Sequence, residues 1–130
     1  MKTNTNITRK DCVVAICDFA RRCREDKNSS PREIYERTGY ARYYASITQE
    51  RVIDLLRTKP RLVDEWLMFS EDKRCTPAWF FEKRPEKMWR VGYIDRNGST
   101  IHEVMFDDSI NACALIVRME MEEFRLENRK

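Results

Sequence analysis

The first half of the chain carries apolar residues at helical spacing. Over residues 10–24 they repeat every three or four positions, which predicts an amphipathic helix. Ser30 precedes Pro31 at the start of a second helix, and Gly39 is expected to end it. Apolar residues at helical spacing and helix-start signals continue beyond Gly39, so the pattern predicts a helical part over residues 9–70.

Two further helices complete this helical part. One is predicted to begin at Thr48, and Pro60 separates it from another over about residues 61–69. Residues 40–44, between the second and third helices, are expected to form a turn or an irregular helix. Residues 1–8 are mostly polar, so we expect a flexible tail there.

The hydrophobic pattern changes near residue 78, where a strand-like aromatic stretch begins. A second strand is predicted over residues 88–94, and Asn97-Gly98 is a strong hairpin signal because both residues tolerate positive φ. The return strand is predicted over residues 99–106. Strict alternation places Ile101, Glu103 and Met105 on one of its faces and His102, Val104 and Phe106 on the other.

The last predicted helix has the clearest pattern in the chain. Asp107 and Asp108 stand where a helix N-cap is expected. The apolar positions that follow keep one helical face: Ile110, Cys113, Ala114, Val117, Met121 and Phe124. The order of elements predicts a single α+β domain over residues 1–130. It has an N-terminal helical half and, over residues 78–126, a three-stranded antiparallel meander with a C-terminal helix packed on the sheet.

Composition is that of a globular domain with a highly ionic surface. The chain has 130 residues, of which 42% are hydrophobic and 36% are charged, with a net charge of +3. A domain of this size folds without disulfides or metals. The polar N-terminus and the lack of a long apolar run predict a cytoplasmic protein without a membrane partner.

Charge is distributed unevenly along the chain. Residues 1–70 are basic on balance, whereas residues 100–127 hold only two arginines against seven acidic residues. The C-terminal end is therefore locally acidic, although the whole protein is slightly basic.

The sequence offers little for catalysis or cofactor binding. Cys12 and Cys23 share a helical face from which Cys17 points away, so their thiols do not converge as zinc ligands do. The single histidine, His102, has no cysteine placed beside it as a nucleophile. The three glycines form no phosphate-binding motif. We therefore expect neither catalytic residues nor metal or cofactor sites, and we interpret the five cysteines as reduced thiols.

A nucleic-acid-binding regulator is the main alternative to a protein-binding module. Residues 34–48 resemble a helix-turn-helix in outline, and Arg42, Tyr43 and Tyr44 would be its contact residues. However, Tyr35 stands where the two helices of that motif need a small residue. A third possibility is a structural subunit of a larger assembly, which would expose a wide apolar sheet face.

Two stretches carry a resemblance to a known class of proteins. They are PRLVDEWLMFSEDKRCTPAWF at residues 60–80, and WRVGY at residues 89–93 followed by FDD at 106–108 and ACA at 112–114. Together they resemble small bacterial immunity proteins of polymorphic or contact-dependent growth inhibition toxin systems. The resemblance implies a monomer or weak dimer that binds and neutralises one cognate toxin domain, often a nuclease, without a cofactor.

Two groups of residues are candidates for contact with such a toxin. The first lies in and before the acidic end and consists of Tyr93, Glu103, Asp107, Asp108, Glu120 and Glu123. The second follows the fourth helix and consists of Asp72, Lys73 and Arg74. Complementary charge would speed encounter with a cationic partner, and a few aromatic side chains would hold the complex.

Overall fold

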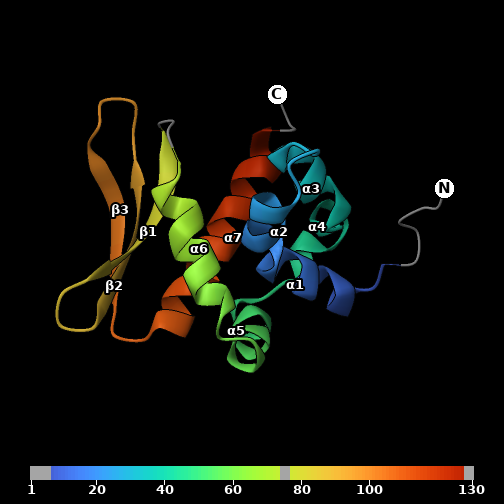
Figure 1. The fold of residues 1–130 in the computed structure, drawn as a ribbon, viewed down its shortest axis with the longest axis horizontal. Helices are drawn as coiled ribbons and strands as arrows, with labels where there is room; N and C mark the ends of the chain where they lie inside the picture. The colour runs from blue at the N-terminus through green and yellow to red at the C-terminus, as the bar shows by residue number, and fades with distance from the viewer. Residues whose placement is uncertain (1–6, 74–76, 128–130) are drawn as a thin grey trace.

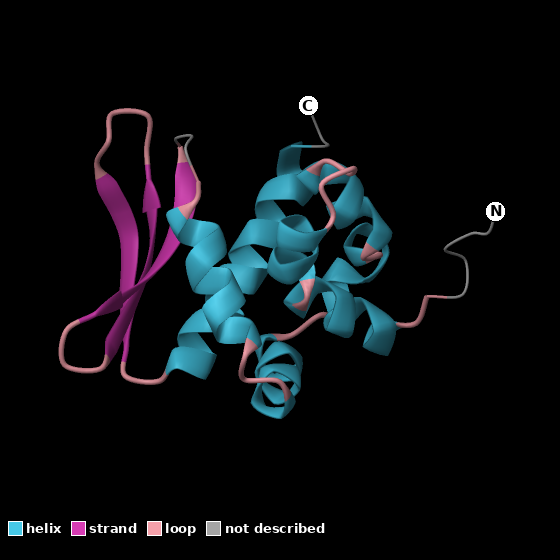
Figure 2. Ribbon diagram, viewed as in Figure 1, coloured by secondary structure: helices cyan, strands magenta, loops and turns pink. Residues whose placement is uncertain are grey.

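The computed structural model describes residues 7–73 and 77–127, and these form a helical part beside a small antiparallel sheet (Figures 1 and 2). The fold class is α+β, as the sequence predicts. The helices before the sheet are α1 (Arg9–Cys17), α2 (Phe19–Glu25), α3 (Pro31–Arg37), α4 (Tyr40–Tyr43), the 3-10 turn η2 (Tyr44–Ser46), α5 (Gln49–Thr58) and α6 (Leu62–Glu71). The strands are β1 (Ala78–Arg84), β2 (Met88–Ile94) and β3 (Thr100–Phe106), and α7 (Ser109–Glu127) follows them.

The first predicted helix is in fact two helices, because the chain breaks at Asp18. This residue ends α1 and precedes α2, and its carboxylate accepts hydrogen bonds from Arg21 and Arg22. Periodicity did not reveal the break, since the apolar spacing continues across it. Ile7 and Thr8 lie against the fold at the other end of α1, where Thr8 forms a capping box with Asp11.

The predicted helix boundaries around Gly39 are confirmed. Ser30 caps α3 with Pro31 in the first turn, and Gly39 adopts a left-handed φ of 81°. Tyr35 is buried, with 1% of its surface exposed, as is Tyr40. Tyr35 is thus a core residue of the hairpin formed by α3 and α4.

Helix α5 shows how packing selects among neighbouring apolar residues. The sequence predicts that Val52, Ile53, Leu55 and Leu56 all point inward. Val52 and Leu56 are fully buried, whereas Ile53 and Leu55 are half-buried at the edge of that face. A helix turns by about 100° per residue, so only positions three or four apart share the centre of the buried face.

The sheet is a meander in the order β1-β2-β3, with antiparallel pairs throughout. Phe81 pairs with Val91 at its centre, and both side chains are buried. A β-bulge lies between β2 and β3, where the register shifts between Val91 and Tyr93. His102, opposite this point, has a positive φ of 54°.

This bulge overturns the strict alternation predicted for the third strand. Ile101 pairs with Tyr93 and Val104 pairs with Val91, two alternate residues of β2. Ile101, Val104 and Phe106 therefore share one face, although alternation separates Ile101 from the other two. One extra residue in a strand reverses the facing of every side chain beyond it.

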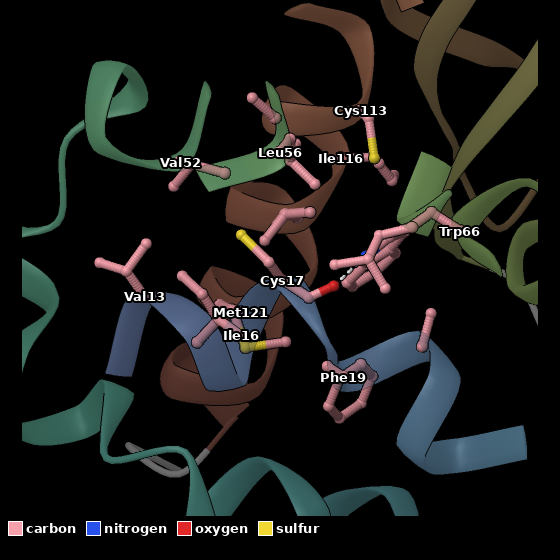
Figure 3. Close-up of a cluster of buried hydrophobic side chains, with 14 of the residues drawn as sticks. Val13, Ile16, Cys17, Phe19, Val52, Leu56, Trp66, Cys113, Ile116 and Met121 are labelled. Atoms are coloured by element: carbon pink, nitrogen blue, oxygen red, sulfur yellow. Dashed lines mark hydrogen bonds between the residues drawn. The ribbon is translucent and has the colours of Figure 1, made fainter. Parts of the chain in front are cut away.

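The main core lies between α7 and the other helices (Figure 3). Trp66 of α6 is fully buried and its indole N–H donates to the carbonyl oxygen of Cys17 at 2.8 Å. Met121 and Val117 fill the same layer from α7. Trp66 is a core residue, whereas Trp79 and Trp89 are only half-buried.

Helices α6 and α7 separate the sheet from the other helices (Figure 1). Helix α6 packs on β1, and α7 packs on β1 and β2 but touches β3 much less. Consequently β3 remains open on both faces, apart from Phe106. Among the described residues, no helix is long and apolar enough to cross a membrane.

Candidate partner-binding surface

Trp79, near the start of β1, lies between two hollows on the surface of the protein. Its ring is half-buried and packs edge-on against Tyr93 of β2, with 5.2 Å between ring centroids. Trp79 and Glu123 line both hollows. We call these two hollows and their shared residues the Trp79 surface.

The first hollow lies where the end of α6, the start of β1 and the last turns of α7 meet. It has a volume of about 370 Å³, and its exposed lining is mainly apolar, with Phe69, Trp79 and Phe124 among its walls. Asp72, Lys73 and Glu120 also line it. The hollow thus combines aromatic walls with a few charged groups, which is the usual character of a specific binding site.

Lys73 and Glu120 form the best-buried ion pair of this surface. The ammonium Nζ of Lys73 lies 2.5 Å from Glu120 Oε1 and donates to the Trp79 carbonyl oxygen at 2.8 Å. Burial raises the pKa of Glu120, and the charge of Lys73 and its hydrogen bond oppose that rise. Because Lys73 contacts both β1 and α7, it holds the floor of the hollow in place.

The second hollow lies between the sheet and the outer side of α7. It has a volume of about 380 Å³ and is lined by Tyr93 and His102 from the sheet and by Met119, Glu123 and Leu126 from α7. Leu126 is 46% exposed. This hollow is more apolar than polar, and the carboxylates of Glu122 and Glu123 line it beside the aromatic and aliphatic side chains.

The backbone of His102 is strained at the rim of this second hollow. A positive φ is uncommon for residues other than glycine and costs of order 1–3 kcal/mol. The bulge that contains His102 directs its side chain towards the hollow.

The structure brings five predicted contact residues together around Trp79. They come from both candidate groups, which lie far apart in sequence: Asp72, Lys73, Tyr93, Glu120 and Glu123. Glu120 is, however, 7% exposed and committed to Lys73, so it supports the surface from below.

The other candidates lie elsewhere. Glu103 is on the opposite face of the sheet, where it pairs with Arg90 at 2.5 Å. Asp108 caps α7 by accepting from the backbone N–H of Ile110, and Asp107 is exposed beside it. About 22 Å of helix separates this cap from Glu123, since an α-helix rises about 1.5 Å per residue. Arg74 lies outside the described residues.

The residues suspected of nucleic-acid contact make contacts within the protein. The Tyr43 hydroxyl donates to the carbonyl oxygen of Ile7 at 2.6 Å, and the Arg42 guanidinium lies over the Tyr43 ring. Tyr44 is 41% exposed, and Arg125 covers its ring at 4.0 Å.

Sequence reasoning did not identify several residues of the Trp79 surface. Trp79 falls in the predicted aromatic strand, and Phe124 falls on the inward face of the last predicted helix. An apolar residue at the end of an inward face gives the same sequence signal whether a neighbour covers it or not. Only the position of β1 beside the ends of α6 and α7 reveals that these rings border a hollow.

The surface offers shape and charge for recognition. Within residues 7–73 and 77–127, no group of three or more histidine, cysteine or acidic side chains is arranged to hold a metal ion. Burial raises the pKa of the Cys12 and Cys17 thiols to about 12, which favours the unreactive protonated form. What the Trp79 surface presents instead is half-exposed aromatic rings beside carboxylates, with a fixed ion pair beneath them.

Comparison with known proteins adds no relative: no family model, no curated protein and no solved structure matches the chain.

Proposed function

We propose that this protein is an immunity protein that binds one cognate toxin domain directly and thereby neutralises it. The observation that carries the proposal is the convergence of Trp79, Tyr93, Lys73 and Glu123 around two hollows from separate parts of the chain. The resemblance of residues 60–80 and 89–114 to such inhibitors points to the same class of function, and residues of the Trp79 surface lie within both stretches.

The chemistry of the surface suits binding to a protein. Half-exposed tryptophan and tyrosine rings are typical anchors of protein interfaces, because they bury a large area at low entropic cost. Glu123 lines the same two hollows as Trp79 and has no ion pair among the described residues. A cationic side chain of the toxin would complement it and accelerate encounter.

The test is neutralisation and binding of the toxin domain encoded beside this protein. Co-expression should restore growth of cells that make the toxin, and the purified pair should elute as a one-to-one complex. Reversing the charge with Glu123→Arg should weaken binding about tenfold or more, mostly through slower association. Glu36→Arg, an equal charge reversal at an exposed position on α3, is the matched control and should change affinity less than twofold.

Clear outcomes would contradict the proposal. If Glu123→Arg and Glu36→Arg weaken binding equally, the Trp79 surface is not part of the interface. If growth inhibition persists despite co-expression, the toxin is not the partner of this protein. Elution with nucleic acid that is released steeply as salt rises would favour a nucleic-acid regulator instead.

A second candidate function, a subunit of a larger assembly, is favoured by the open strand β3. Three of its apolar side chains are exposed: Ile101 by 37%, Val104 by 43% and Met105 by 46%. An edge strand of this kind readily pairs with another chain. Light scattering of the purified protein would distinguish the two, since a subunit should self-associate and Val104→Lys should abolish that association.

A further inference from the structure

A groove apart from the two hollows of the Trp79 surface lies on the helical part of the protein, between α1 and α5. It has a volume of about 640 Å³. In Figure 1 the sheet lies beyond α6 and α7 as seen from α1. Val13 and Leu55 form an apolar floor, and the hydroxyl-bearing Thr8 and Thr58 also line the groove.

Three unpaired cations border this groove. Arg9 and Lys10 come from the first turn of α1 and Arg51 from the first turn of α5, and all three are exposed. Within the described part of the chain none of them forms an ion pair, whereas many other arginines do, such as Arg24 with Glu65 at 2.7 Å. Among the described residues, Asp54 is the one acidic residue that lines the groove, and its carboxylate lies 3.9 Å from the Arg57 guanidinium.

The α1 helix start adds little to this charge. The capping box of Thr8 and Asp11 takes up the backbone N–H groups of these two residues, and the Asp11 carboxylate offsets part of the positive end of the helix. The attraction for an anion therefore comes from the three side chains, which are free to turn towards a ligand. Three cations against one carboxylate give the groove a local excess of positive charge.

We propose that this groove binds an acidic peptide segment of a partner protein. The carboxylates of such a segment would pair with Arg9, Lys10 and Arg51, and an aliphatic side chain between them would rest on Val13 and Leu55. A nucleic acid fits less well, because single strands bind by stacking on aromatic rings and no aromatic side chain lines this groove among the described residues. The site is separate from the Trp79 surface, so the proposal goes beyond toxin binding.

The experiment measures binding of a fluorescein-labelled peptide in which pairs of glutamates flank leucines. Fluorescence anisotropy at low salt should show saturable binding to the full-length protein. The double variant Arg9→Gln/Arg51→Gln should weaken it about fivefold or more, because two charge pairs are lost. Lys83→Gln/Arg96→Gln removes the same charge from exposed positions in the sheet region, outside the groove, and should change affinity less than twofold.

Two further measurements separate the groove from general electrostatic attraction. Leu55→Ala should weaken peptide binding without changing net charge, and a peptide with serine in place of leucine should bind less tightly. Circular dichroism of each variant checks that the fold is retained. Because the groove is distinct from the Trp79 surface, Arg9→Gln/Arg51→Gln should still neutralise the toxin, so failure of one proposal does not affect the other.

The proposal would be overturned if the two double variants weakened peptide binding equally. It would also be overturned if the peptide bound saturably with the same affinity to Leu55→Ala as to the wild type. Tighter binding of an oligothymidylate than of the peptide, with loss on Arg9→Gln/Arg51→Gln, would also overturn it and identify the groove as a nucleic-acid site.

Discussion

Glu122 illustrates how one charged side chain joins separate parts of this protein. Its carboxylate accepts two hydrogen bonds from Arg125, at 2.7 and 2.9 Å, and a third from the hydroxyl of Tyr40. Arg125 in turn lies over the ring of Tyr44. A residue on α7 thus fixes α4 and the turn after it, although 82 positions separate it from Tyr40.

These contacts predict a pH-dependent contribution to stability. The hydrogen bond from Arg125 lowers the pKa of Glu122 below its ordinary value of 4.5, against the opposing effect of burial. A lowered pKa means that the stabilisation is present above the ordinary value and is lost as pH falls through the lowered one. Glu122→Gln should therefore cost about 1–2 kcal/mol at pH 7, and this difference should shrink below pH ~4.

The measurement is urea unfolding of wild type and variant over a range of pH. Glu123→Gln is the matched control, because the neighbouring carboxylate has no ion pair among the described residues, and it should change stability by less than about 0.5 kcal/mol. A Glu122→Gln cost that is independent of pH would show that the carboxylate charge is not what stabilises the protein.

At the scale of elements, the sheet depends on one close approach between strands. Phe80 of β1 lies across Gly92 of β2, and a Cβ atom built at position 92 would come within 2.7 Å of the end of the Phe80 ring. The bulge with His102 lies directly beside this pair. The absence of a side chain at Gly92 therefore lets an aromatic ring cover the sheet where its ladder is irregular.

Gly92→Ala should destabilise the protein by about 1–3 kcal/mol, because the Phe80 ring must move or the strands must separate. Denaturant unfolding measures this cost. The double variant Gly92→Ala/Phe80→Leu should recover part of it relative to Phe80→Leu alone, since the smaller side chain leaves room for the methyl group. If the stability costs of the two single substitutions simply add in the double variant, the strain at position 92 does not come from contact with Phe80.

At the scale of the whole molecule, the buried thiols report on global unfolding. Cys12 and Cys17 of α1 and Cys113 of α7 are each 0% exposed. Figure 3 shows Cys17 and Cys113 in the core layer that unites the helices. Burial raises the pKa of Cys23 as well, to about 12. Opening this layer requires separation of α1 from α7, which removes most of the core.

In a Cys75→Ser variant at neutral pH, a thiol reagent should therefore label Cys12, Cys17 and Cys113 only at the rate at which the protein unfolds. Mass spectrometry of the labelled peptides measures each site separately. The urea-unfolded protein, in which all four remaining thiols react, is the control. Rapid labelling of Cys17 under native conditions would mean that this layer opens locally.

Much of the architecture could be predicted from the sequence because it depends on local signals. The cap at Ser30, the stop at Gly39 and the hairpin at Asn97-Gly98 act through neighbouring backbone groups, and all were found where predicted. The aromatic stretch near residue 78, the hairpin signal and the helical spacing likewise identified the three strands and α7, although the strict alternation expected in the third strand was wrong. The antiparallel meander then followed from short connections between strands.

Other features depended on contacts between distant residues and needed the tertiary structure. The break at Asp18 interrupts a stretch whose apolar spacing is continuous, and the bulge at His102 is set by the pairing of β2 with β3. The separation of Glu103 and Asp107 from Glu123 has the same origin, since charge along the chain does not specify which face a side chain occupies. The sequence by itself determined the elements and the acidic character of the C-terminal end. Which aromatic rings and carboxylates meet around Trp79 was decided only by the tertiary structure, because contacts such as the ion pair of Lys73 with Glu120 join residues 47 positions apart.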